Sequence, residues 1–270
     1  MAEIDAIRLA TQPATVASLS ADLRALGLPY GATVMVHSSL SRLGYVSGGA
    51  HAVVVALLEV LGAAGTLVMP THSGDLSDPA AWRSPPVPDA WWQTIRDEML
   101  PFDAELSPTR QMGAIVECFR HVRGVRRSDH PTVSAAALGP NTDTVVDGHG
   151  LAHGLGESSP QARLYELDGW VLLLGVTHAN NTSLHLAEYR AEFPNKPWTT
   201  HSSPVRRDGH RHWVTYDDLE DGSDDFEQIG DAFAETGLER HGPIAAGRGR
   251  LSRVRDIVDF GVRWIETHRT

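Results

Sequence analysis

The sequence predicts a single α/β domain in which a mixed, largely parallel central sheet is flanked by helices. Short β-branched or apolar runs alternate with helical patterns from about residue 14 onward, and such alternation is typical of α/β sandwiches. Residues 170–176 form the most apolar run and indicate a central strand that is covered on both faces. No internal repeat or linker divides the 270 residues, so we expect one domain over residues 1–270.

The first half of the chain begins with a predicted helix over residues 14–26. Its apolar residues recur every three or four positions, and Gly27 is a typical C-terminal stop. A β-branched run at residues 33–36 predicts a strand that carries the sequence His-Ser-Ser at its carboxyl end. The next expected elements are a helix over residues 49–60, a strand over residues 66–69, and a long loop over residues 71–101 that is rich in proline and tryptophan. Long ordered loops are usually functional.

Two Ser-Pro pairs mark predicted helix starts in the second half of the chain. Serine is favoured at the N-cap and proline in the first turn, so Ser107-Pro108 and Ser159-Pro160 each predict a helix. The other elements expected are a strand over residues 133–138, the strand at 170–176, a helix over 181–192, a hairpin around 206–216, an acidic surface loop at 217–225, and a final helix that contains residues 257–264.

Charge and cysteine content narrow the classes of function. The chain has 23 Lys plus Arg against 34 Asp plus Glu, a formal net charge of −11. This charge disfavours nucleic-acid binding, which needs a basic face, and suits a cationic partner or simply solubility. The single cysteine, Cys118, cannot form an internal disulfide, and the first residues lack the pattern of a signal peptide. No apolar run approaches the roughly 20 residues that a membrane helix needs, so we expect a cytoplasmic protein.

Four segments carry a resemblance to a known family. They are HSSLSRLG at 37–44, SPTRQMG at 107–113, RSDHP at 127–131 and LLLGVTHANNTSLHLAEYR at 172–190, and LSRVRDIVDFG at 251–261 follows them. In this order and spacing the segments resemble the aminoglycoside 3-N-acetyltransferases over nearly the whole chain. The resemblance implies transfer of an acetyl group from acetyl-CoA to the 3-amino group of the 2-deoxystreptamine ring of an aminoglycoside antibiotic, with no metal. Such an activity would give antibiotic resistance.

Thr182, His185 and Glu188 are the candidate catalytic residues. They are spaced by three, so on a helix they lie along one face. An amine substrate arrives mostly as ammonium and must lose a proton before it attacks a thioester. Histidine has a suitable pKa for this step, and a carboxylate on its second nitrogen fixes the tautomer. The alternative is a helix start with an ordinary exposed ion pair.

Two segments are candidates for binding the coenzyme. His37, Ser38 and Ser39 follow a strand at the place where an open α/β sheet usually holds its ligand. The resemblance implies that residues 107–113 also contact acetyl-CoA. Thr109 and Arg110 beside a helix start could bind a phosphate or a pantetheine carbonyl. The full candidate set in the second segment is Ser107, Thr109, Arg110, Met112 and Gly113. Ser107 could instead be a helix cap only.

Carboxylates are the expected partners of the ammonium groups of the substrate. Asp75, Asp129 and Glu188 are the candidates for this role, and Asp78 and Asp103 lie near the same segments. Each ammonium group that leaves water requires such a partner.

Aromatic and histidine side chains are further candidates in the cleft. His130 in RSDHP could orient the substrate or hydrogen-bond within a turn before Pro131, and His153 and His178 could each line the cleft. Three tryptophans of the long loop could cover sugar rings or anchor that loop, namely Trp82, Trp91 and Trp92.

Three other functions remain open at this stage. The 14 histidines suggest a metal-dependent hydrolase, but no His-Glu-x-x-His run is present. A non-catalytic amine- or CoA-binding protein would have no obvious use for the set around His185. The same chemistry on another amine of metabolism is the closest alternative. We interpret Cys118 as a packing residue, which favours direct transfer over a covalent cysteine route. A homodimer is left open.

Overall fold

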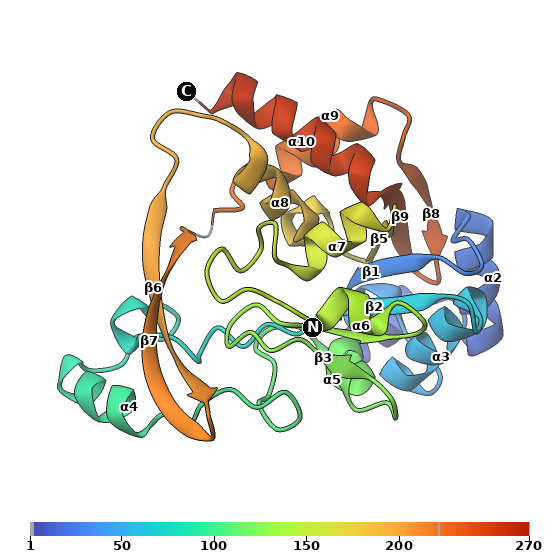
Figure 1. Ribbon diagram of the computed structural model, residues 1–270. Coiled ribbons are helices and arrows are strands. Elements are labelled where there is room, and N and C mark those ends of the chain that lie inside the picture. The colour runs from blue at the N-terminus through green and yellow to red at the C-terminus, as the bar shows by residue number, and fades with distance from the viewer. Residues whose placement is uncertain (1–2, 221, 270) are drawn as a thin grey trace.

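Over residues 3–220 and 222–269, which the computed structural model describes, the core is a seven-stranded mixed sheet between two layers of helices (Figure 1). The strands lie in the order β3-β4-β2-β1-β5-β9-β8. Their bounds are β1 Thr33–Ser38, β2 Thr66–Pro70, β3 Arg126–Arg127, β4 Ala135–Leu138, β5 Trp170–Leu174, β8 Arg240–Ile244 and β9 Gly247–Arg253. The predicted α/β fold with a mixed sheet is therefore confirmed.

The sheet is parallel only at its centre. Strand β1 pairs in parallel with β2 and with β5. The pairs β2–β4, β3–β4, β5–β9 and β8–β9 are antiparallel. The expectation of a largely parallel sheet is therefore wrong. A short turn joins β8 to β9, and a tight turn permits only antiparallel pairing. This hairpin was not predicted, because its strands include glycine and proline and have no strong period-two pattern.

Helices cover both faces of the sheet. One apolar core lies under α2 (Val16–Leu26), α3 (Gly49–Leu61) and α5 (Ala114–Arg120). The second lies under α6 (Thr142–Val146), α7 (Pro160–Glu166), α8 (Ser183–Arg190), α9 (Phe226–Ala234) and α10 (Val254–His268). Side chains alternate between them along each strand, so Val34 and Val36 enter the first core and Met35 the second. By the same alternation, the side chain of His37 lies on the face of the sheet that carries the second core.

The shorter helices lie at the margins of this core. Helix α1 (Glu3–Leu9) exposes about half of the surface of Ile4, Ile7 and Leu9. The remaining short segments are α4 (Trp92–Glu98) and the 3-10 helices η1 (Leu40–Leu43), η2 (Pro79–Ala81), η3 (Asp89–Trp91) and η4 (His178–Asn180). The long loop predicted at 71–101 therefore contains short helices.

One of the two predicted Ser-Pro helix starts is confirmed. The Ser159 hydroxyl accepts a hydrogen bond from the N–H of Ala162 and caps α7. The other start is wrong, because α5 begins at Ala114 and residues 107–113 form a loop. There the Ser107 hydroxyl accepts from the N–H of Asp103 instead of capping a helix.

A long hairpin stands beside the sheet at the left of Figure 1. It comprises β6 (Trp198–Arg207) and β7 (His210–Leu219), so it is longer than predicted and takes in the start of the predicted acidic loop. Residue 221 of that loop lies outside the described residues. Arg211 near the tip donates to the carbonyl of Met99 at 2.7 Å. Near the base, the N–H of His153 donates to the carbonyl of Asp217 at 3.0 Å. The hairpin is thus fixed at both ends.

Candidate active site

The candidate active site lies at the carboxyl ends of the three parallel strands. Strand β1 runs into residues 37–39, β2 into residues 71–73, and β5 into residues 175–178. Helix α3 connects β1 to β2 on one face, and α7 precedes β5 on the other. Neighbouring connections that leave on opposite faces open a crevice, which is where α/β sheets usually bind ligands.

The His185–Glu188 pair on α8 has the geometry of a general base and its supporting carboxylate. Nδ1 of His185 lies 2.6 Å from Oε2 of Glu188, and 16% of the histidine side chain is exposed against 6% of the glutamate. With Nδ1 donating to the carboxylate, Nε2 is the nitrogen that can accept a proton. Nε2 has no hydrogen-bond partner within the described part of the chain.

An arginine holds the other side of the Glu188 carboxylate. Nη1 of Arg269 donates to Oε1 of Glu188 at 2.7 Å, and the same guanidinium binds both oxygens of Asp225 at 2.7 and 2.8 Å. These two carboxylates raise the pKa of Arg269, although burial opposes them. Arg269 thus fixes Glu188 from the C-terminal end of α10. Arg269 was not among the predicted site residues, because it lies 81 positions from Glu188 in the sequence.

Thr182, the third residue of the predicted catalytic set, lies beside the end of β1. The Thr182 hydroxyl accepts from Nε2 of Gln161 at 3.2 Å and lies 3.5 Å from Nε2 of His37. His37 is 4% exposed. Burial lowers its pKa to about 3, with further lowering by His178 and His185. The structure therefore brings the first coenzyme candidate, at 37–39, next to the start of α8.

The two predicted coenzyme segments lie side by side. A Cβ added to Gly113 would lie 3.9 Å from the carbonyl oxygen of Ser38, and the N–H of Arg110 donates to the carbonyl of His72 at 2.8 Å. The Ser38 hydroxyl is buried and has no partner among the described residues. Buried polar groups nearly always have one, so this hydroxyl is available to a ligand. The Ser39 hydroxyl lies 3.3 Å from that of Ser41.

Other side chains of residues 107–113 are already engaged. The N–H and hydroxyl of Thr109 both donate to Oε1 of Glu117, and Arg110 donates to the carbonyl of Ser84 at 2.9 Å. Met112 packs against the first core. These contacts shape the loop, and the exposed Arg110 is the charged side chain in it that a coenzyme could recruit.

The acidic candidates have different surroundings. Asp75 is half-buried, Asp129 is exposed, and neither carboxylate has a partner within residues 3–220 and 222–269. Asp78 pairs with Arg96 at 2.8 Å. Asp103 accepts from the N–H groups of two following residues. Asp75 is therefore the best placed of these acids to meet an ammonium group.

His130 and its neighbours in RSDHP hold loops together. His130 is fully buried, and its Nδ1 accepts from the N–H of Val133 at 3.1 Å while Nε2 lies 3.2 Å from the carbonyl of Leu151. The contacts support the turn interpretation of this residue. Arg127 donates to the carbonyl of Ser107 at 2.6 Å and to the hydroxyl of Ser73 at 3.2 Å. This arginine therefore joins the loop after β2 to the second segment predicted to bind the coenzyme.

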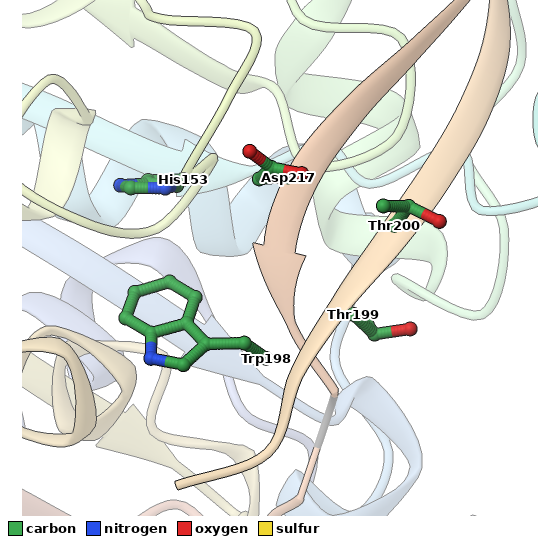
Figure 2. A pocket seen from close by; sticks show the side chains of 5 residues that line it. All are labelled: His153, Trp198, Thr199, Thr200 and Asp217. Atoms are coloured by element: carbon green, nitrogen blue, oxygen red, sulfur yellow. The ribbon is translucent and has the colours of Figure 1, made fainter.

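A cavity of about 510 Å³ opens beside the base of the hairpin. It is lined by His153, Trp198, Thr199, Thr200 and Asp217, and Figure 2 shows these side chains with Asp217 between His153 and Thr200 in the view. The ring of His153 lies 5.9 Å from that of Tyr189, which is four residues after His185 and so shares its face of α8. The cavity thus borders α8, which carries His185.

The aromatic residue at this cavity was not among the candidates. Trp198 is 53% exposed and its ring lies 5.0 Å from that of His153. In contrast, the indole N–H of Trp82 donates to the Ser77 hydroxyl within its own loop, which supports the anchoring interpretation there. The sequence signal that could have identified Trp198 is a tryptophan at the start of a strand. The pairing of β6 with β7, which brings Asp217 beside Thr200, was not visible in the sequence.

His178 forms a second His–Glu pair away from solvent. Its Nε2 lies 2.6 Å from Oε2 of Glu239, and each side chain is 1% exposed. A Cβ at Gly230 would lie 2.2 Å from Cγ of His178, so α9 covers the ring. The expectation that His178 lines the cleft is therefore wrong, whereas His153 does line a cavity.

Two further observations concern ligand and membrane binding. Within the described residues, no three His, Cys, Asp or Glu side chains are grouped as metal ligands. No described helix combines the length and the apolar character needed to cross a bilayer.

Comparisons with known proteins agree with the segments quoted above. The family of aminoglycoside 3-N-acetyltransferases matches residues 35–266. The prophage-derived aminoglycoside N(3')-acetyltransferase-like protein YokD of Bacillus subtilis is 42% identical over 94% of this chain and 93% of its own, and its crystal structure superposes with a TM-score of 0.95. Aminoglycoside N(3)-acetyltransferase VIII of Streptomyces fradiae is 37% identical over 99% of this chain and 97% of its own.

Two solved structures of similar enzymes contain ligands. The AAC-IIIb binary complex with CoASH has a TM-score of 0.85 and 32% identity, and covers 96% of this chain and 98% of that one. The room-temperature structure of sisomicin-bound AAC-VIa has a TM-score of 0.86 and 32% identity, with 96% and 100% covered. Sequence and fold thus agree over nearly the full length of both partners, and this chain belongs to the aminoglycoside 3-N-acetyltransferase family of enzymes.

Proposed function

We propose that this protein transfers the acetyl group of acetyl-CoA to the 3-amino group of the 2-deoxystreptamine ring of an aminoglycoside. His185 is the base in this proposal and Glu188 supports it. The observation that carries the assignment is the partly exposed His185–Glu188 pair. Nδ1 of His185 contacts the carboxylate, and Nε2 has no partner among the described residues. Its position beside the meeting point of residues 37–39 and 107–113 supports a reaction between two bound substrates.

The chemistry follows from the free nitrogen. The amine must be unprotonated when its lone pair attacks the carbonyl carbon of the thioester, and Nε2 of His185 takes the proton that is lost. The C–N bond forms, the C–S bond breaks, and the sulfur leaves as a thiolate that takes the proton from the His185 imidazolium, which restores the neutral base. Glu188 stabilises the imidazolium in the meantime, because its carboxylate lies 2.6 Å from Nδ1. Thr182, within 3.5 Å of His37, is available to hydrogen-bond the reacting groups.

Direct transfer is favoured over a cysteine route. Cys118 is half-buried on α5 and packs against the first core. A nucleophilic thiol needs access and a nearby positive group or base. Cys118 lies on the opposite face of the sheet from α8, so it does not share the face on which His185 acts.

The coenzyme would lie against the two adjoining segments. The unpartnered Ser38 hydroxyl and the backbone near Gly113 offer hydrogen bonds, and Arg110 offers a positive charge. The CoASH complex of AAC-IIIb supports acetyl-CoA as the acyl donor. The other residues proposed for this side of the cleft are His37, Ser39, Ser107, Thr109 and Met112.

The acceptor would lie between α8, the loop after β2 and the hairpin. Asp75 offers an unpaired carboxylate there, and Asp217 with Trp198 offers a second acidic and aromatic surface. Ammonium groups pair with carboxylates, and the face of an indole attracts cations. The sisomicin complex of AAC-VIa supports an aminoglycoside as acceptor. Asp129, His130 and Glu188 remain weaker proposals for contact with it, and the cytoplasm remains the expected compartment.

One assay tests this function. Purified protein is incubated with acetyl-CoA and a panel of aminoglycosides while free thiol is measured, and NMR of the product locates the acetyl group. We expect thiol release that depends on the antibiotic and acetylation at the 3-amino group. Release only with other amines would establish the alternative acceptor class. No release with any amine would reject the transferase assignment.

A further inference from the structure

We propose that His72 is a further catalytic residue, whose imidazole N–H donates a hydrogen bond to the carbonyl oxygen of the acetyl thioester and to the oxyanion that forms from it. The proposal rests on the acetyl transfer proposed above. His72 lies between the second coenzyme segment and the catalytic helix, and no role has been assigned to it so far.

The backbone directs His72 toward α8. The N–H groups of Thr71 and Ser73 donate to the carbonyls of Ser134 and Thr132, each at 2.8 Å, so the chain stays extended beyond the end of β2. The hydroxyls of Thr71 and Ser73 both accept from Arg127. Successive side chains of an extended chain point to opposite faces. His72 therefore points away from Arg127, toward the face that carries the second core and α8.

Strand register places His72 near two other histidines. Met35 of β1 pairs with Val68 of β2, and both belong to the second core. Counting on by two in β1 and by four in β2 puts His37 and His72 on that same face. His37 contacts Thr182 at the start of α8. Three histidines, His37, His72 and His185, therefore converge on one region.

His72 is half-buried, and one of its ring nitrogens is buried without a partner. Its Nε2 is inaccessible to solvent and has no hydrogen-bond partner in the described part of the chain. Buried polar atoms of this kind are rare and require an explanation such as a catalytic role. The carbonyl of the same residue accepts from the N–H of Arg110 at 2.8 Å, so the backbone of His72 adjoins the predicted coenzyme segment.

His72 is suited to donate a hydrogen bond and not to act as a second base. Burial first, and then the positive charges of His185, His37, His149 and Arg127, lower its pKa to about 3. A group with this pKa stays neutral near pH 7 and cannot hold a proton taken from an ammonium. A neutral imidazole still carries one N–H. It also avoids repulsion with the imidazolium that forms on His185.

The hydrogen bond acts on charge that develops during transfer. As the amine nitrogen bonds to the carbonyl carbon, the electron pair of the C=O double bond moves onto the oxygen. A preorganised donor stabilises this oxygen more than it stabilises the starting carbonyl. When the C–S bond breaks, the electron pair returns and the double bond re-forms. His72 keeps its proton throughout.

Kinetics of two replacements test the proposal. Phenylalanine keeps a planar ring without a donor, whereas glutamine keeps an N–H donor. We expect His72→Phe to lower kcat about 100-fold, as loss of one oxyanion donor does, with a small change in the KM for acetyl-CoA. His72→Gln should recover most of the rate. The pH profile of both variants should keep the midpoint of the unchanged protein, because the base is still His185.

Infrared spectroscopy gives a readout that needs no aminoglycoside. Acetyl-CoA labelled with carbon-13 at the carbonyl is bound to the protein and its stretching frequency is measured. We expect a lower frequency with the unchanged protein and with His72→Gln, and a return toward the value in water with His72→Phe. His51→Phe, on the exposed surface of α3 at the opposite face of the sheet, is the control.

The outcomes separate this proposal from the proposed function. A carbonyl band that is the same in the unchanged protein and in folded His72→Phe would overturn the role of His72. Equal kcat losses in the Phe and Gln variants, with lowered thermal stability in both, would assign His72 to packing instead. If the band responds to His72 but no aminoglycoside is acetylated, the acceptor assignment fails and the donor role stands.

Discussion

The molecule contains two His–Glu pairs with the same contact distance and different access. His185 and Glu188 lie three residues apart on one helix, with 16% and 6% of their side chains exposed. His178 and Glu239 lie 61 residues apart, and each is 1% exposed. In both pairs a ring nitrogen lies 2.6 Å from a carboxylate oxygen. Distance alone therefore does not distinguish a base from a structural contact.

The difference lies in the second nitrogen of each ring. Nδ1 of His178 lies 3.3 Å from Nδ2 of Asn181, so both of its nitrogens are engaged. Nε2 of His185 has no such partner among the described residues and can accept a proton. Asn181 in turn accepts from the N–H of Ser183 at 3.1 Å. The sealed pair thus fixes the first turn of the helix that carries the open pair.

The largest effect is expected at the open pair. Replacing His185 by Ala should lower kcat about 100-fold or more, because a positioned base contributes on that scale, while coenzyme binding should change little. Steady-state kinetics and calorimetric titration with CoA measure the two quantities. Near-normal turnover in folded His185→Ala would remove this residue from the catalytic role and erase the contrast with His178.

Matched replacements of the two glutamates should separate activity from stability. Glu239→Ala leaves His178 and Arg250 near an emptied buried site, and removal of one partner of a buried pair costs about 3 kcal/mol or more. Glu188→Gln should lower kcat about tenfold, since it removes the charge that stabilises the imidazolium, with a smaller effect on unfolding. Urea unfolding and kcat per folded molecule are measured for both. The reverse pattern would exchange the roles of the two pairs.

Acid should destabilise the protein through the histidines whose pKa values burial lowers. The pKa values of His37, His72 and His130 are lowered to about 3, and that of His149 to about 4, chiefly by burial. An unfolded histidine titrates near 6.5. Between pH 6.5 and about 4, the unfolded chain therefore binds protons that the folded chain does not, so stability is full above pH 6.5 and falls as the pH decreases.

The size of this acid effect can be measured directly. Each buried neutral histidine should remove up to about 2 kcal/mol from the free energy of unfolding between pH 7 and pH 5. Urea titrations at both pH values, followed by tryptophan fluorescence, give this difference. An unfolding free energy that is equal at pH 7 and pH 5 would mean that these rings take up protons in the folded protein as readily as in the unfolded chain.

The contrast also explains what the sequence could predict. The open pair lies within one helical turn, so a spacing of three, together with the family resemblance, predicted that His185 and Glu188 lie on one helix face. The sealed pair and the Arg269–Glu188 contact join residues 61 and 81 positions apart, and only the packing of α9 and α10 brings them together. Local signals also placed β1, α2, α3, β2, α7 and β5. The β8–β9 hairpin lacks such a signal.

The loop candidates show the same limit. Ser107-Pro108 carries a valid helix-start signal, but Asp103 and Glu117 take up the hydrogen-bonding groups of this segment and keep it as a loop. His130 belongs to the family-like segment RSDHP, yet its bonds to Val133 and Leu151 depend on how two loops meet. The family resemblance therefore drew attention to these segments, and tertiary contacts decide how each of them is held.

The smallest expected effect concerns the electrostatic attraction of the acceptor to the protein. This attraction should depend on accessible carboxylates such as Asp75 and not on the buried Glu239. An aminoglycoside carries several ammonium groups, so attraction to the unpaired Asp75 should weaken as salt screens it, with a Debye length of about 8 Å near physiological ionic strength. We expect an increase to about 0.5 M salt to lower kcat/KM for the antibiotic several-fold through KM, because charge pairing precedes chemistry.

Substitution of single acids identifies the residue responsible. Asp75→Asn should reproduce part of the salt effect and flatten the remaining salt dependence, since the charge that salt would screen is already absent. Asp129→Asn removes the same charge from an exposed turn whose neighbours Ser128 and His130 face inward, and it should change KM less. Equal effects of the two substitutions would indicate that only net charge matters. A KM that changes neither with salt nor with either substitution would direct the search for the acceptor toward neutral or singly charged amines. Such amines do not need Asp75 or Asp129 as a partner.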